Sequence, residues 1–227
     1  MTLTETAIPA ETLEVAAALG PGVLTRGLVL GGGTGIALRL AHRRSRDLDQ
    51  LLTRPGGDQI PTATLLSALR ATFGDSSVVT TLRSSTQLDC QVRGVRLSWI
   101  GYPFELVDEP SSWHGLRVAS LLDAAAMKAY TVGRRIAARD YIDLYAIFRS
   151  GVTVGAVVER AQEIFVLEGS HVFDGHLFAK QLTCAEDCED VDEAMSDVVD
   201  GSLAWETVTT SLTDRALEWE NTTGVGR

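Results

Sequence analysis

The 227-residue sequence predicts an α/β protein of the mixed α+β kind, with a mixed sheet in its first half and helices in its second. Hydrophobic residues make up 45% of the chain, which is enough for a large core. Polar and apolar residues alternate on both sides of Arg93-Gly94, as in a β-hairpin. After Trp113 this alternation gives way to segments rich in Ala, Leu and Met. We therefore expect one domain at residues 1–112 and a helical domain at 113–227.

The first half should contain short elements separated by glycine and proline. Gly31-Gly32-Gly33 predicts a turn, because consecutive glycines favour no regular element. Thr34 is placed to cap the helix that follows the turn. The other predicted elements are a helix at 9–20, an apolar segment at 24–30 that forms a strand or a helix end, a strand at 47–51, a helix at 65–73, and hairpin strands at 86–92 and 95–100.

The second half should be helical throughout. The predicted helices cover residues 118–130, 136–148 and 152–168, with further helices through Trp205 and Trp219. Gly133 separates the first two. This half is expected to complete the functional site of the first.

The formal net charge of −10 argues against a protein that coats nucleic acid without sequence preference. The acidic excess lies in the second half, above all in AEDCEDVDEAMSDVVD at residues 185–200. This run predicts either a solvated face or a docking surface for a basic partner. No apolar run is long enough to cross a bilayer, and the N-terminal segment lacks the basic start of a signal peptide. We expect a cytoplasmic protein that has no membrane partner.

The glycine cluster has three interpretations. A Walker-type phosphate loop fails, because no Gly-Lys-Ser/Thr follows at the required spacing. A dinucleotide fingerprint fails because Ile36 stands where its third glycine belongs. The third interpretation is a glycine turn that opens a helix, followed by a strand with a D-x-D pair. Polymerase-β-type nucleotidyltransferases hold a nucleotide in this way, with backbone N–H groups of Gly32 and Gly33 and the hydroxyl of Thr34 at the triphosphate.

Asp47 and Asp49 form the D-x-D pair. On a strand the two side chains point to the same face, where they could hold Mg²⁺ (or Mn²⁺) together with substrate phosphates. The metal would polarise the α-phosphate and stabilise the leaving pyrophosphate. The alternative is a tight turn followed by a solvated strand face.

A second group of charges lies in KAYTVGRRIAARDYIDLYAIF, residues 128–148. Arg139 and Asp143 are four residues apart on the predicted helix, and Asp140 shares their face. One interpretation places Lys128 at the triphosphate, with the carboxylates orienting it. The other is an ordinary network of helix salt bridges.

Together these segments resemble the AbiEii/AbiGii nucleotidyltransferase toxin family. The resemblance rests on GGTGIALRL, on HRRSRDLD, and on Lys128, Arg134, Arg139-Asp140 and Asp143-Leu144-Tyr145, and it spans residues 26–210. It implies a polymerase-β-like nucleotidyltransferase domain followed by a helical domain.

The resemblance also implies a function and a set of site residues. Characterised relatives are toxins of toxin–antitoxin or phage-defence systems, and some add nucleotides from an NTP to the 3′ end of tRNA. The implied partners are thus an NTP, tRNA and a cognate antitoxin. By motif, Thr34 and Ser45 would contact phosphates, Asp47 and Asp49 would bind metal, and Lys128 and Asp143 would complete the catalytic site. The nucleotide-binding set would further include Gly32, Gly33, Arg43, Arg44, Arg46, Arg134 and Asp140.

The sequence departs from the family at the third carboxylate. Such enzymes commonly use another acid on a neighbouring strand to activate the attacking hydroxyl. The return strand VRLSWI offers Ser98 instead, and Asp89 on the preceding strand is the nearest candidate. Two further hypotheses therefore stay open: a nucleotide- or partner-binding module with little or no turnover, and nucleotidyl transfer to a protein hydroxyl.

Overall fold

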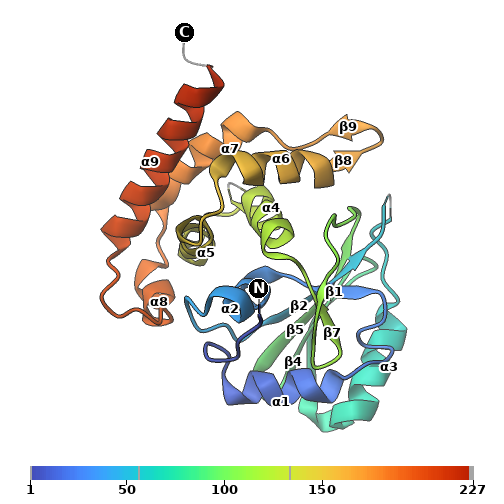
Figure 1. Cartoon of the computed structure of the whole chain (residues 1–227). Coiled ribbons are helices and arrows are strands. Elements are labelled where there is room, and N and C mark those ends of the chain that lie inside the picture. Colours follow the sequence, from blue (N-terminus) through green and yellow to red (C-terminus); the bar gives the residue numbers. More distant parts are fainter. Residues whose placement is uncertain (1, 56, 133, 225–227) are drawn as a thin grey trace.

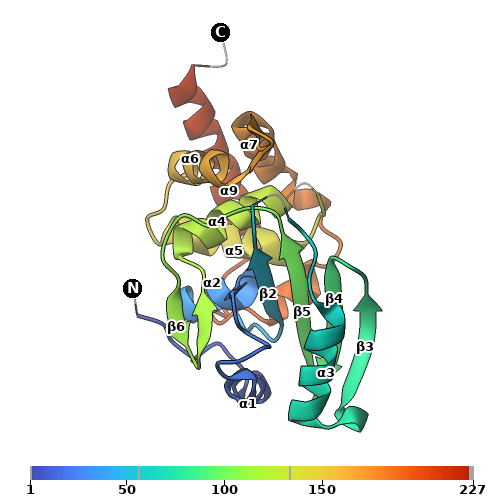
Figure 2. The ribbon, with the colours of Figure 1, turned by 90° about the vertical axis from the view of Figure 1, so that its right-hand side faces the viewer.

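The computed structural model describes residues 2–55, 57–132 and 134–224. Its centre is a seven-stranded mixed sheet with the order β3-β4-β5-β2-β1-β7-β6 (Figures 1 and 2). The strands are β1 (Leu28–Leu30), β2 (Leu48–Thr53), β3 (Val78–Arg83), β4 (Gln87–Val92), β5 (Val95–Tyr102), β6 (Ser111–Trp113) and β7 (Leu116–Val118). The mixed α/β class predicted from the sequence is confirmed.

Strand β2 lies at the centre of the sheet, between β1 and β5. β1 runs antiparallel to β2, and β5 runs parallel to it with Asp49 opposite Ser98. A parallel neighbour needs a long crossover connection. Helix α3 (Thr62–Phe73), β3 and β4 supply it. The predicted hairpin is confirmed as β4 and β5, with Asp89 opposite Ser98.

Each face of the sheet packs against its own apolar core. One core joins the sheet to α1 (Ala10–Leu19) and α3, with Trp99 fully buried in it. The other core joins the sheet to the helical half through residues such as Leu51 and Tyr141. Helix α2 (Gly32–Leu40) contributes to both, with Ile36 in one core and Leu38 in the other. The start of α2 is therefore held from both sides.

The second half forms a helical layer over the second face of the sheet (Figure 1). Its elements are α4 (Leu121–Thr131), α5 (Ala138–Arg149), α6 (Val154–Ile164), the short hairpin β8 (Val166–Leu167) and β9 (Ser170–His171), α7 (Gly175–Leu182), α8 (Val191–Ser196) and α9 (Trp205–Thr223). Short 3-10 helices lie at Asp75–Ser77 and Thr183–Asp187. In the part of the chain that the structure describes, no single helix is long and apolar enough to cross a membrane. Helices α5 and α6 reach that length only as a pair bent by 115°.

Several predicted elements differ from those observed. The glycine turn is shorter than expected, because α2 already begins at Gly32, with Gly31 as its N-cap. The change to helical structure comes later than residue 112, because β6 and β7 join the sheet and Leu30 pairs with Val118. Helix α6 ends at Ile164, and the hairpin of β8 and β9 replaces its predicted last turn. Strand β3 was not predicted; it pairs with β4 through a bulge between Thr80 and Leu82.

Candidate active site

Two glycines at the start of α2 form one wall of the site. Gly32 has a φ of 60°, and a Cβ atom there would lie 2.3 Å from Oδ2 of Asp49. A Cβ atom on Gly33 would lie 2.1 Å from Nη2 of Arg43. Glycine is needed at both positions because charged side chains pack directly against the helix start. The first backbone N–H groups of a helix lack intrahelical partners and favour anions.

Asp47 and Asp49 lie together beside these glycines. Asp49 belongs to β2, whereas Asp47, the first residue of the predicted strand, directly precedes the observed one. Burial, and then the negative charge of Asp47, raise the pKa of Asp49. Two neighbouring carboxylates would both be stabilised by a bound cation.

A cavity of about 160 Å³ lies in front of the two aspartates. Of the residues predicted for the site, ten line it: Gly32, Gly33, Arg43, Arg44, Ser45, Arg46, Asp47, Asp49, Lys128 and Asp140. The structure therefore brings together side chains from the glycine element, the D-x-D element and the later KAYTVGRRIAARD segment. Thr34, Arg134 and Asp143 are not among the lining residues.

Thr34 supports the site from behind. Its side chain is buried, and its hydroxyl lies 2.8 Å from Ser45 Oγ and donates a hydrogen bond to the backbone oxygen of Asp47. This hydroxyl is thus occupied in fixing the loop that carries Ser45 and Asp47. The contact between Thr34 and a phosphate stays a prediction.

Asp143 is the centre of a buried ion-pair network. Arg43 donates to both carboxylate oxygens, at 2.7 and 3.0 Å, and His42 Nε2 lies 2.7 Å from Oδ1. Lys128 Nζ lies 2.9 Å from Asp143 and 2.8 Å from Asp140, and none of the Asp143 side chain is exposed. Burial alone would raise the pKa of Asp143, but Arg43, Lys128 and His42 together hold it well below its usual range. The salt-bridge interpretation of this segment describes Asp143 best.

Lys128 and Asp140 link this network to the cavity. Burial would lower the pKa of Lys128, but Asp143 and Asp140 raise it, so the amine stays charged. Asp140 also accepts two hydrogen bonds from Arg135, at 2.9 and 3.0 Å. The two side chains thus reach the wall of the cavity with their charges already paired.

Sequence reasoning missed three residues of the cavity: Arg96, Arg135 and Asp197. Arg96 lies on the same face of β5 as Ser98, as the alternating pattern of the sequence predicts. What the sequence did not reveal is that β5 pairs with β2, which places this face at the site. Arg135 is still 62% exposed although it pairs with Asp140, so its guanidinium is accessible to an anion. Arg134 turns away from the cavity, because its guanidinium lies over the ring of Tyr130, 3.4 Å from the centroid.

The acidic segment packs against the basic run at residues 42–46. Arg44 N donates to Asp197 O, and Val199 N donates to His42 O. Arg43 and Val198 form an isolated antiparallel bridge, and Arg46 pairs with Asp197 at 3.1 Å. The end of the predicted acidic run is therefore an internal docking surface for the basic run of the same chain.

The position expected for a third acid holds a serine. Asp49, Ser98 and Asp89 occupy one row across β2, β5 and β4, so all three face the site side of the sheet. Both oxygens of Asp89 accept from the side-chain amide of Gln87, at 3.0 and 3.1 Å. Two strand spacings, about 10 Å, separate the backbones of Asp49 and Asp89. In the described part of the chain, no group of three or more His, Cys, Asp or Glu side chains is arranged to hold a metal ion.

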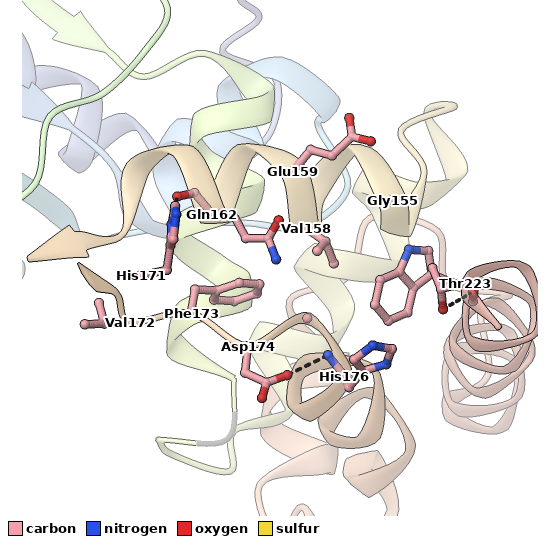
Figure 3. Close-up of a pocket in the computed structure, with 12 residues that line it drawn as sticks. Gly155, Val158, Glu159, Gln162, His171, Val172, Phe173, Asp174, His176 and Thr223 are labelled. Atoms are coloured by element: carbon pink, nitrogen blue, oxygen red, sulfur yellow. Dashed lines mark hydrogen bonds between the residues drawn. The ribbon is translucent and has the colours of Figure 1, made fainter. Parts of the chain in front are cut away.

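A larger cavity of about 650 Å³ lies in the helical half, between α6, α7 and α9. Figure 3 shows Phe173 near its middle, with Gln162 above and Asp174 and His176 below. Asp174 accepts from the backbone N–H of His176 and so caps α7. None of the residues that line this cavity lines the one at Asp47 and Asp49. It is therefore separate from the candidate active site.

Comparisons with known proteins agree with this geometry. Residues 17–213 match the model of the family described as nucleotidyl transferase AbiEii toxin, type IV TA system. Among solved structures, MenT4, a nucleotidyltransferase toxin from Mycobacterium tuberculosis, is 17% identical, with a TM-score of 0.54 over 92% of this chain and 86% of that one. JHP933 from Helicobacter pylori is 18% identical, with a TM-score of 0.53 over 97% of this chain and 94% of that one. At this identity the solved structures support the fold alone. No curated protein matches the chain.

Proposed function

Because the chain belongs to the AbiEii nucleotidyl transferase toxin family, we propose that it transfers a nucleoside monophosphate from an NTP to an RNA acceptor, the 3′ end of tRNA. The acceptor's 3′ oxygen forms the new bond to the α-phosphorus, and the bond to pyrophosphate breaks. The hydroxyl proton leaves to solvent or to a nearby base. Such a reaction would act in the cytoplasm, and a cognate antitoxin would restrain it.

One observation carries this proposal: two carboxylates, a helix start and several basic side chains meet in one cavity. Backbone N–H groups at Gly32 and Gly33 offer an anion site beside Asp49. The accessible guanidinium groups suit phosphate oxygens, to which they can donate in a fork. Those that line the cavity are Arg44, Arg46, Arg96, Arg135 and Arg139. The combination fits a triphosphate better than a neutral ligand.

The residues present fit Mg²⁺. Mg²⁺ is typically bound by one or two carboxylates, with waters and substrate phosphates completing its coordination. Asp47 and Asp49 supply two such oxygen donors. Burial and the charge of Asp47 raise the pKa of Asp49 although nearby basic groups lower it, so a bound cation would stabilise its ionised form. When bound, the metal would supply Lewis-acid polarisation of the α-phosphate.

The protein's own side chains then bind and orient the substrate. Arg135 and Arg96 lie on the side of the cavity nearest α4 and β5, and Arg44 and Arg46 lie on the side of the basic run. Arg43 and Lys128 are already paired with aspartates. We therefore assign them a structural role, in which they hold α4, α5 and the segment after α2 together. Asp143 takes the same structural role.

The Ser98 position bears on the rival hypotheses. A hydroxyl there cannot act as a general base of ordinary strength, which favours slow turnover or binding without turnover. We keep transfer as the leading function because Asp47 and Asp49 are both present and both face the cavity. Transfer to a protein hydroxyl uses the same donor site and differs only in the acceptor.

One experiment tests donor, base choice and acceptor together. The protein is incubated with Mg²⁺, total tRNA and each labelled NTP in turn, and RNA and protein are resolved on gels. We expect label on tRNA, none with Asp47→Ala, and wild-type labelling with Asp214→Ala, which removes an exposed aspartate from α9. Label on protein alone would show that the acceptor is wrong, and no label with any NTP would favour the binding module.

A further inference from the structure

A second hollow, of about 290 Å³, opens from the candidate active site. It shares five lining residues with the first cavity: Gly32, Asp49, Arg96, Lys128 and Arg135. The two hollows therefore meet beside Asp49, the point at which the α-phosphate of a bound NTP would lie. The first hollow is strongly basic and suits phosphates. The second continues from it in another direction.

The walls of the second hollow are partly apolar and partly polar. Leu51, Ile100 and Gln87 form a row across β2, β5 and β4, directly beyond the row of Asp49, Ser98 and Asp89. Ala124, Met127 and Thr131 of α4 line the opposite side. A flat apolar ring can be buried between a sheet face and a helix without loss of hydrogen bonds at its faces.

Tyr102 lies at the far end of the hollow, one row beyond Ile100 on β5. Four residues along the sheet separate its row from that of Asp49, which is about 13 Å at 3.3 Å per residue. Its hydroxyl is buried and has no hydrogen-bond partner among the residues that the structure describes. Such a group is costly unless a ligand or water satisfies it.

Gln87 offers a second polar contact with a fixed orientation. Its side chain approaches both oxygens of Asp89, which can only accept, so the NH₂ end of the amide must face that carboxylate. The carbonyl oxygen is then the end left to accept a hydrogen bond from another group. Gln87 also lines the hollow.

The other tyrosine of the hollow is less available. The ring of Tyr130 stacks on Phe165, with centroids 4.1 Å apart and an angle of 18° between the ring planes. The guanidinium of Arg134 lies 3.4 Å from the same ring centroid. Because two groups cannot share one face at these distances, both faces of Tyr130 are covered, and only its edge remains for a ligand.

We propose that the second hollow binds the base of the NTP whose phosphates lie in the first, and that Tyr102 Oη and Gln87 Oε1 recognise the polar edge of that base. This inference rests on the proposed function, because it needs a nucleotide at Asp49. It identifies Tyr102 and Gln87 as specificity-determining residues. The apolar walls contribute affinity common to all four bases.

The test compares NTPs with inorganic tripolyphosphate, which has the phosphates but no base. Dissociation constants are measured by calorimetry with Mg²⁺ and without acceptor RNA, for the wild type, Tyr102→Phe and Ala124→Leu. Tyr141→Phe is the matched control, because its hydroxyl donates to Gln181 O in the helical core and does not line either hollow. Thermal unfolding of each variant shows whether it folds.

We expect the wild type to bind one NTP more tightly than the others. Tyr102→Phe should weaken the binding of that NTP by roughly five- to tenfold, because one hydrogen bond is lost. The affinities for the four NTPs should then become more similar. Ala124→Leu fills the hollow and should weaken the binding of every NTP. Tripolyphosphate should bind equally to all folded variants, and Tyr141→Phe should match the wild type.

Two results would overturn the inference while leaving the proposed function in place: equal affinity of the wild type for all four NTPs, or unchanged NTP affinities in Tyr102→Phe. Tyr102→Phe decides the matter alone if Ala124→Leu does not fold. A wild type that binds neither NTP nor tripolyphosphate would instead remove the proposed function, and this inference with it.

Discussion

Asp143→Ala should destabilise the protein severely. The carboxylate is fully buried and accepts hydrogen bonds from Arg43 through both of its oxygens. Lys128 would keep Asp140 as a partner, but Arg43 would lose its buried counter-charge. Removing one member of a buried ion pair costs about 3–5 kcal/mol, because the remaining charge stays desolvated. A protein of ordinary stability has about 5–15 kcal/mol in total.

Urea unfolding, followed by the fluorescence of the four tryptophans, measures this loss. Asp47→Ala is the control. The Asp47 carboxylate lines the cavity, so its removal should change the free energy of unfolding by at most about 0.5 kcal/mol. The double variant Arg43→Met/Asp143→Leu removes both charges and should recover much of the loss. If Asp143→Ala unfolds within 1 kcal/mol of the wild type, the network is not what stabilises this region. Asp143 would then return to the list of direct catalytic residues.

Three further predictions concern the site. Gly32→Ala should abolish nucleotide transfer, because its Cβ would displace the Asp49 carboxylate and its φ of 60° disfavours alanine; Gly22→Ala, with no atom within 4 Å, should match the wild type in the labelling assay. Asp89→Asn should leave turnover nearly unchanged, because Gln87 already occupies both oxygens; a loss of roughly 100-fold would restore Asp89 as the general base. Burial lowers the pKa of His42 from 6.5, so the unfolded chain binds a proton that the folded protein does not, and the free energy of unfolding should fall as the pH drops below 6.5. In urea-unfolding measurements across pH, His42→Gln should reduce the dependence of the free energy of unfolding on pH below 6.5. The lowered pKa values of Asp140 and Asp143 should add a further loss of stability only below their usual value of 3.8.

The sequence was most informative where local pattern and packing agree. The hairpin of β4 and β5 shows the alternation of a half-buried sheet, and the structure pairs Gln87–Val92 with Val95–Ile100 as that pattern requires. The two aspartates and the glycines lie within 18 residues, so their proximity depends on a single helix and the loop after it. These features needed no knowledge of distant contacts.

The missed features depend on contacts between distant segments. β3 carries exposed Val79 and Leu82 and a bulge, so it lacks the alternation that marks a strand. β7 is a three-residue strand that pairs with the equally short β6 and, through Leu30 and Val118, with the distant β1. The role of Asp143 as a buried ion-pair partner could not be predicted either, because Arg43, which neutralises it, lies 100 residues earlier in the sequence.

The docking of the acidic segment on residues 42–46 also fixes the order in which the site can be completed during synthesis. Arg46 and Asp197 are separated by 151 residues, and Arg43 and Asp143 by 100. Chains are made at about 5–20 residues per second, and N-terminal parts fold first. The sheet and its two aspartates can therefore form while the residues that hold the basic run have not yet been translated. In a nascent chain the two aspartates can be in place while the basic run still lacks Asp197, so the cavity is completed only near the end of translation.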